Sequence, residues 1–198
     1  MDSGTAAREP ADGFQKRTLS IRSFLASSWW FATNLPRLAR ATLTSRIDDQ
    51  FREKILLAVT AANDCRYCAR FHTATASLVG VDDETIDRIL ATDIETAVSD
   101  AERPALLFAL HYADTDGTPS PELVTALEAA YEPKTAADIV ALTRAMHLAN
   151  LLGNTVDATA YHTERRIDGA LTDARQRCPI SETGLLEPSV SVAGDGDS

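Results

Sequence analysis

Two cysteines and a histidine lie close together in the middle of the chain, at Cys65, Cys68 and His72. If a helix begins at Asn63 or Asp64, both good N-cap residues, these three side chains fall within an arc of ~60° on one helix face. A CxxC pair held in this way can attack an oxidant, form a sulfenic acid and resolve it as an internal disulfide. The spacing therefore indicates thiol redox chemistry.

The distances along a helix divide the roles of the three residues. Cys68 and His72 are four residues apart, ~6 Å along the axis, so the imidazole can act directly on the Cys68 thiol as a base. Cys65 is seven residues from His72, ~10 Å by the same rise, but it lies at the positive end of the helix dipole, which favours a thiolate. Exposure and the dipole favour Cys65 as the attacking thiol, and the adjacent histidine favours Cys68. The sequence leaves this choice open.

Glu53 is one of three consecutive charged residues before a nearly continuous apolar run, from Ile55 to Ala62. A helix of that composition must be buried on most of its surface. A carboxylate there can orient His72 and fix its tautomer, as the third member of a nucleophile–base–orienter set. The alternative is an ordinary carboxylate near a helix N-terminus, stabilised by the dipole.

Three other uses of a CxxC pair are weighed against the redox interpretation. Zinc would find three ligands here, with Glu53, Cys178 or another histidine as the fourth, but the second ligand pair of a structural zinc module is absent. A thioredoxin-like site needs a preceding strand in a βαβ pattern, and no strand is evident. Haem attachment needs a histidine directly after the second cysteine, where this chain has Ala69.

The elements that must position these residues are helical throughout. Ala and Leu dominate, and alternating Val/Ile/Thr runs bounded by hairpin turns are missing. The pattern predicts one all-α domain of about seven or eight helices. Proline and capping residues set the expected bounds: 21–34, 48–62, 65–79, a short helix capped by Asp82 and ending at Leu90, 101–113, 121–131, 136–152 and 155–175.

Length and composition limit the classes of protein. The 198 residues suit a single domain, which we expect at 18–178, between a flexible arm at 1–17 and a flexible acidic tail at 179–198. The net charge of −10 disfavours nucleic-acid and membrane-surface roles. Three cysteines are too few for a secreted disulfide scaffold, and the N-terminal residues lack an apolar signal region. We therefore expect a cytoplasmic protein.

Other reactive or aromatic residues receive structural assignments. The remaining histidines are expected to be packed or surface side chains rather than ligands: His111, His147 and His162. Cys178 is expected to be an incidental thiol. An early aromatic cluster is expected in the core, with a subunit interface or a pocket wall as the alternative: Phe24, Trp29, Trp30 and Phe31.

The spacing of Glu53, Cys65, Cys68 and His72 resembles the motif of the AhpD-like alkylhydroperoxidases, within the carboxymuconolactone decarboxylase superfamily. Cys65 follows the glutamate by twelve residues, the second cysteine comes three later, and the histidine four after that. The resemblance covers roughly residues 40–155. In AhpD proteins a second histidine often precedes the second cysteine, and here that position is Tyr67.

The resemblance implies an all-helical homotrimer or homohexamer that reduces small hydroperoxides without metal, haem or another cofactor. It assigns catalytic roles to Glu53, Cys65, Cys68 and His72, with the glutamate and histidine as a proton relay. The reductant would be a protein dithiol or a lipoyl group. True lactone decarboxylases generally lack the CxxC pair, which argues against decarboxylation. Two alternatives remain: a non-catalytic oligomer that binds zinc or senses redox state at this site, and a relative that acts on a carbon acid with Glu53 or His72 as base.

Overall fold

The computed structural model describes residues 15–43 and 46–177. Over these residues the chain is helical and has no strand, which confirms the predicted all-α fold. The helices are α1 (Ile21–Leu43), α2 (Asp49–Asn63), α3 (Arg66–Leu78), α4 (Asp83–Leu90), α5 (Ile94–Ala97), α6 (Arg103–Asp114), α7 (Pro121–Ala130) and α8 (Pro133–Arg177). None of these helices is both long and apolar enough to cross a membrane.

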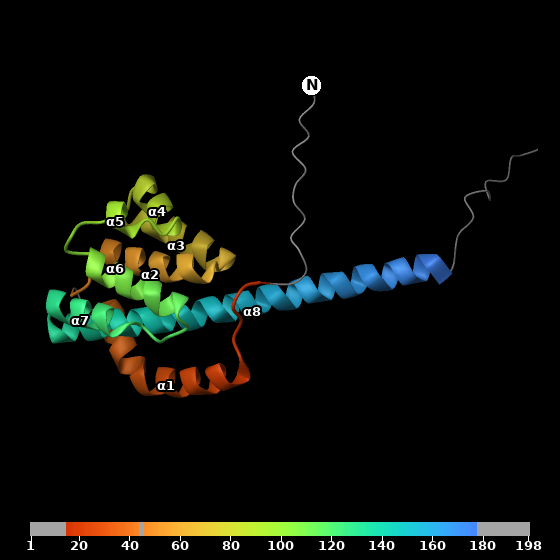
Figure 1. Ribbon diagram of the computed structural model, residues 1–198, viewed down its shortest axis with the longest axis horizontal. Coiled ribbons are helices and arrows are strands. Elements are labelled where there is room, and N and C mark those ends of the chain that lie inside the picture. Colours follow the sequence, from red (N-terminus) through yellow and green to blue (C-terminus); the bar gives the residue numbers. More distant parts are fainter. Residues whose placement is uncertain (1–14, 44–45, 178–198) are drawn as a thin grey trace, which may run out of the picture. The chain divides into compact units, whose positions relative to one another are not determined.

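The chain divides into two compact units, residues 1–160 and 161–198. The first unit holds α1 to α7 and the first part of α8 (Figure 1). The described part of the second unit is the remainder of α8, residues 161–177, where Ile167 and Leu171 are exposed. Most of the predicted N-terminal arm (1–14) and all of the predicted tail (179–198) lie outside the described residues, as does Cys178.

The core of the first unit forms around α2, which packs against α6, α3 and α4. Because α2 has neighbours on several sides, its apolar residues are buried around most of its circumference. Its fully buried side chains include Ile55, Leu57, Ala58 and Val59. This helix also carries Glu53, so the core fixes the position of one predicted site residue.

Several predicted helix ends are confirmed by their caps. Asp48, Asp82 and Ser120 each accept a hydrogen bond from the backbone three residues later, at the starts of α2, α4 and α7. Gly80 follows the C-cap of α3 with a φ of 92°, the left-handed conformation that glycine adopts without strain. The short helix α5 was not predicted, because four residues give no measurable periodicity.

Two predicted helix breaks are wrong. The first helix does not end before Pro36 but continues to Leu43. Proline removes one intrahelical hydrogen bond, and the turn that follows it is held instead by burial of Leu38 and Ala41. The helices predicted at 136–152 and 155–175 are one element, α8, which begins at Pro133 and runs through Gly153. That glycine serves close packing rather than termination, as shown below.

The prediction that the early aromatic cluster lies in the core is wrong for the three side chains that are exposed on α1: Phe24, Trp29 and Phe31. Trp30 is partly buried, and the guanidinium carbon of Arg144 lies 4.3 Å from the centre of its ring. The contact is a cation–π interaction between α1 and α8.

Candidate active site

A tight turn between α2 and α3 presents the first cysteine. Asp64 adopts a left-handed conformation (φ 49°, ψ 43°) and ends α2, which aspartate tolerates better than most residues. Cys65 is then the N-cap of α3, and its Sγ accepts a hydrogen bond from the backbone N–H of Cys68 at 3.4 Å. The expectation that Asn63 or Asp64 caps this helix is wrong, because Asn63 is the last residue of α2. The cysteine itself occupies the position where the helix dipole favours an anion.

The burial of the two cysteines contradicts the expectation that Cys65 is the more exposed of the pair. Cys65 is only 1% exposed, whereas Cys68 is partly exposed, so exposure favours Cys68 as the sulfur that a substrate meets. Both are free thiols. Gly153 of α8 lies directly against them: a Cβ on this residue would lie 2.8 Å from Cys65 Sγ and 3.7 Å from Cys68 Sγ. Helix α8 therefore closes one side of the CxxC pair, and only glycine allows it to come so near.

Burial raises the pKa of the Cys68 thiol to about 12, and the hydrogen bond and charge of Cys65 contribute in the same direction. The backbone N–H of Cys68 acts in the opposite sense. Cys68 is consequently a neutral thiol near pH 7. For it to act as a nucleophile, a base must take its proton as the reaction begins.

The predicted partnership of Glu53 and His72 is present in the structure. His72 Nδ1 and Glu53 Oε2 are 2.8 Å apart, and the glutamate is 4% exposed. The other carboxylate oxygen, Oε1, lies 3.8 Å from the Nε of Arg52. Because Nδ1–H donates to the carboxylate, Nε2 of the imidazole is left as the proton acceptor. The pair therefore has the form of an oriented general base, one helical turn after Cys68 on α3.

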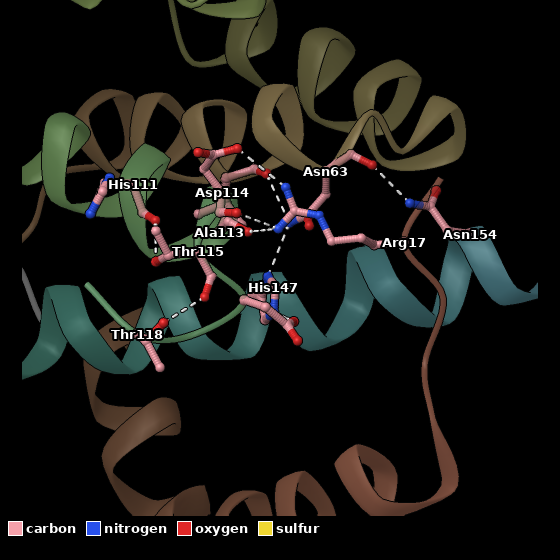
Figure 2. A network of polar contacts seen from close by, with 11 residues as sticks. Arg17, Asn63, His111, Ala113, Asp114, Thr115, Thr118, His147 and Asn154 are labelled. Atoms are coloured by element: carbon pink, nitrogen blue, oxygen red, sulfur yellow. Dashed lines mark hydrogen bonds and ion pairs between the residues drawn. The ribbon is translucent and has the colours of Figure 1, made fainter. Parts of the chain in front are cut away.

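A buried polar network holds the end of α2, just before Cys65. Asn63 donates through Nδ2 to the carbonyl of Val59 and to His147 Nδ1, each at 3.1 Å. Its own carbonyl accepts a hydrogen bond of 2.8 Å from Asn154 Nδ2 (Figure 2). Asn63 and Asn154 are 3% and 1% exposed. Two side chains of α8 thus fix the backbone from which the cysteine turn starts.

His147 is buried, as predicted for a packed histidine, but it also takes part in this network. Its Nε2 lies 3.1 Å from Asp116 Oδ1, and the ring of Tyr112 packs edge-on against it. Burial lowers the pKa of His147, against the opposite effect of Asp116. Its neutral form, with Nδ1 accepting from Asn63 and Nε2–H donating to Asp116, satisfies both ring nitrogens.

Two basic residues of the N-terminal segment join the same region. Lys16 Nζ donates to the carbonyl of Asp64 at 2.9 Å and pairs with its carboxylate at 3.2 Å. Arg17 donates to the carbonyls of Ala113 and Asp114 at the C-terminal end of α6, as Figure 2 shows. A cation at this end of a helix is stabilised by the dipole. The segment thereby connects the cysteine turn with α6.

Tyr67 occupies the position at which AhpD proteins often have a histidine, and its side chain contacts Arg66. Its hydroxyl accepts a hydrogen bond of 2.8 Å from Arg66, and Arg66 also pairs with Asp157 of α8 at 2.5 Å. Tyr67 thus offers no base to the site. Among the described residues, no group of three or more His, Cys, Asp and Glu side chains is arranged to hold a metal ion.

Residues 31–111 match the model of the carboxymuconolactone decarboxylase family. The match covers less than half of the chain, so it is a likeness of this segment to that family. The family segment contains all four predicted site residues, Glu53, Cys65, Cys68 and His72. The searches of curated proteins and of solved structures found no match.

The part of α8 that meets the site lies beyond the family segment. Sequence reasoning did not identify Gly153, Asn154 or Asn63 as site neighbours, and it took Gly153 to lie at a helix break. The available signal was the seven-residue spacing of His147 and Asn154, which places both on one face of a helix. Polar residues on a buried face indicate partners across the interface.

Proposed function

We propose that this protein is a thiol-dependent peroxidase or disulfide oxidoreductase of the AhpD-like type. The observation that carries the proposal is the hydrogen bond of 2.8 Å between Glu53 and His72, on the helix that places a CxxC cysteine one turn before the histidine. The family segment at 31–111 and the spacing of the four residues support it. Cys68 is assigned as the attacking thiol because it is the more exposed of the pair.

In the first step, His72 Nε2 takes the proton of Cys68, and the Cys68 thiolate attacks the terminal oxygen of the hydroperoxide. The sulfur–oxygen bond forms as the oxygen–oxygen bond breaks. The alkoxide leaves with the proton held by His72, so the products are an alcohol and the sulfenic acid of Cys68. Glu53 stabilises the transient positive charge on the imidazole.

In the second step, Cys65 attacks the sulfur of the Cys68 sulfenic acid. The sulfur–sulfur bond forms, the sulfur–oxygen bond breaks, and hydroxide leaves with the Cys65 proton as water. The two thiols have then supplied both electrons. The disulfide returns to two thiols through exchange with an external dithiol, for which we propose a protein dithiol or a lipoyl group.

The test is titration of the reduced protein with one equivalent of cumene hydroperoxide, read by intact mass and peptide mapping. The expected result is the loss of two hydrogens and a disulfide between Cys65 and Cys68. The Cys65→Ser variant should stop at a sulfenic acid on Cys68 that dimedone traps, whereas Cys68→Ser should consume peroxide far more slowly. Cys178→Ser is the control and should behave as the parent. Full peroxide consumption by both single variants would refute the proposal.

A second candidate uses the Glu53–His72 pair alone, as a base toward a carbon acid. The observation that favours it is that this pair is complete without either sulfur, in a segment that matches the carboxymuconolactone decarboxylase family. The doubly substituted Cys65→Ser/Cys68→Ser protein separates the candidates. Under the first function, this protein should lose all peroxide-dependent turnover. Under the second, it should keep the turnover of a lactone carboxylate, and His72→Gln should abolish that turnover.

A further inference from the structure

A second concave site lies away from the cysteines, between α6, α7 and α8. The cavity has a volume of about 540 Å³, within the range of roughly 300–1,000 Å³ that is usual for small-molecule sites. Its apolar wall is formed by side chains from all three helices: Phe108, Val124, Leu127, Ala136, Ala137 and Val140. None of Glu53, Cys65, Cys68 and His72 lines it, so it is not part of the candidate active site.

Two polar side chains of this cavity have no hydrogen-bond partner among the described residues. Tyr112 of α6 and Arg144 of α8 both line it, and within the described part of the chain neither side chain forms a hydrogen bond or an ion pair. The Arg144 guanidinium lies over the ring of Trp30, a contact that does not use its N–H donors. Hydrogen-bond donors that converge in an apolar cavity are the groups that orient a bound ligand.

The turn after α6 leaves room for the tyrosine. Gly117 has a φ of 88°, and a Cβ on it would lie 3.2 Å from the Tyr112 hydroxyl oxygen. Burial raises the pKa of Tyr112, while the charge of nearby Arg144 acts in the opposite direction. At neutral pH the side chain is therefore a phenol that can donate its proton in a hydrogen bond.

The two charged side chains of the cavity differ in their exposure to solvent. Besides Arg144, the one ionised side chain among its lining residues is Glu128 of α7. Glu128 is exposed, whereas Arg144 is partly buried, so the less solvated charge is positive. An unpaired guanidinium in partly apolar surroundings favours an anionic partner, and the fork of N–H groups suits a carboxylate.

We propose that this cavity binds a small organic anion with one carboxylate and an apolar body. The carboxylate accepts hydrogen bonds from the Arg144 guanidinium and the Tyr112 hydroxyl, and the apolar body packs against Phe108, Leu127 and Val140. This site shares no residue with the proposed thiol chemistry.

The experiment is a calorimetric titration of the full-length, reduced protein with octanoate, and with 1-octanol as the uncharged probe of the same length. Octanoate should bind, and 1-octanol should bind about tenfold or more weakly, since it lacks the charge-assisted hydrogen bonds. Arg144→Gln should weaken octanoate binding by a similar factor, and Arg144→Lys by less. Tyr112→Phe should give a smaller loss than Arg144→Gln.

Two controls keep the result interpretable. Arg165→Gln removes another arginine that lies over a ring, that of Tyr161, and should leave octanoate binding unchanged. Val140→Trp should fill the cavity and abolish binding, provided that its circular dichroism matches the parent; Leu127→Trp serves if it does not. The proposal is overturned if octanoate does not bind at millimolar concentration, if 1-octanol binds equally well, or if Arg144→Gln binds like the parent.

Discussion

The contact of Gly153 with the two sulfurs can be tested by adding a single methyl group. In Gly153→Ala, the new Cβ would lie 2.8 Å from Cys65 Sγ, well inside van der Waals contact, so α8 or the cysteine turn must shift. Replacing glycine by alanine inside a helix ordinarily stabilises by about 1 kcal/mol. Overpacking of a filled site costs about 1–3 kcal/mol. The net expectation is a change between zero and about 2 kcal/mol of destabilisation.

The same helix provides the matched control. Gly169 has no atom within 4 Å of the position that its Cβ would take. Gly169→Ala therefore keeps the propensity gain without the clash, and should be neutral or stabilising by up to about 1 kcal/mol. The two variants should differ by roughly 1–3 kcal/mol in the free energy of unfolding, the cost of overpacking alone.

The assay is urea denaturation of the reduced proteins, followed by far-ultraviolet circular dichroism and analysed by linear extrapolation. A second readout is the rate at which iodoacetamide alkylates Cys65, which is 1% exposed in the structure. Displacement of α8 in Gly153→Ala should increase that rate, and Gly169→Ala should leave it unchanged. Equal stabilities and equal alkylation rates in the two variants would refute the close contact.

Three further outcomes are expected. Cys65→Ser should lower the pKa of Cys68, because Cys65 contributes to its elevation; the pH dependence of Cys68 alkylation measures this, and an unshifted profile would contradict it. Glu53→Gln should slow peroxide-dependent oxidation about 10²-fold, as expected for loss of an oriented general base, and stopped-flow thiol titration should detect it. The folded-state pKa of His147 is lowered from 6.5, so the unfolded chain binds more protons below that pH and stability should fall as the pH drops. In urea titrations between pH 7 and 5, His147→Gln should reduce the pH dependence of the free energy of unfolding. His162→Gln, a substitution of an exposed histidine, should leave that dependence unchanged.

Local sequence determined the all-α fold and most helix starts. Three residues cap their helices through hydrogen bonds that span only three positions: Asp48, Asp82 and Ser120. The local sequence is therefore enough to predict where these helices begin. The predicted breaks at Pro36 and near Gly153 were wrong for the opposite reason. Proline and glycine have local tendencies that tertiary packing overrides, and the packing partners are remote in sequence.

The site shows the same division. Spacing along the chain sufficed to place Cys65 at the start of α3 and Cys68 and His72 along it. It left two roles open for Glu53, which lies nineteen residues before His72 and on another helix, and the histidine relay was what the family resemblance implied. Helical geometry relates residues a few positions apart without knowledge of the rest of the fold.

Only the tertiary structure decided which cysteine is exposed. The N-cap position predicted an accessible, dipole-stabilised Cys65, but α8 approaches through Gly153 and buries it. Asn154 of the same helix fixes the preceding turn by its hydrogen bond to Asn63. Burial depends on which surfaces meet, and these surfaces lie about ninety residues apart in the chain. Local pattern thus determined the chemical groups of this site, and the packing of a distant helix determined their access to solvent.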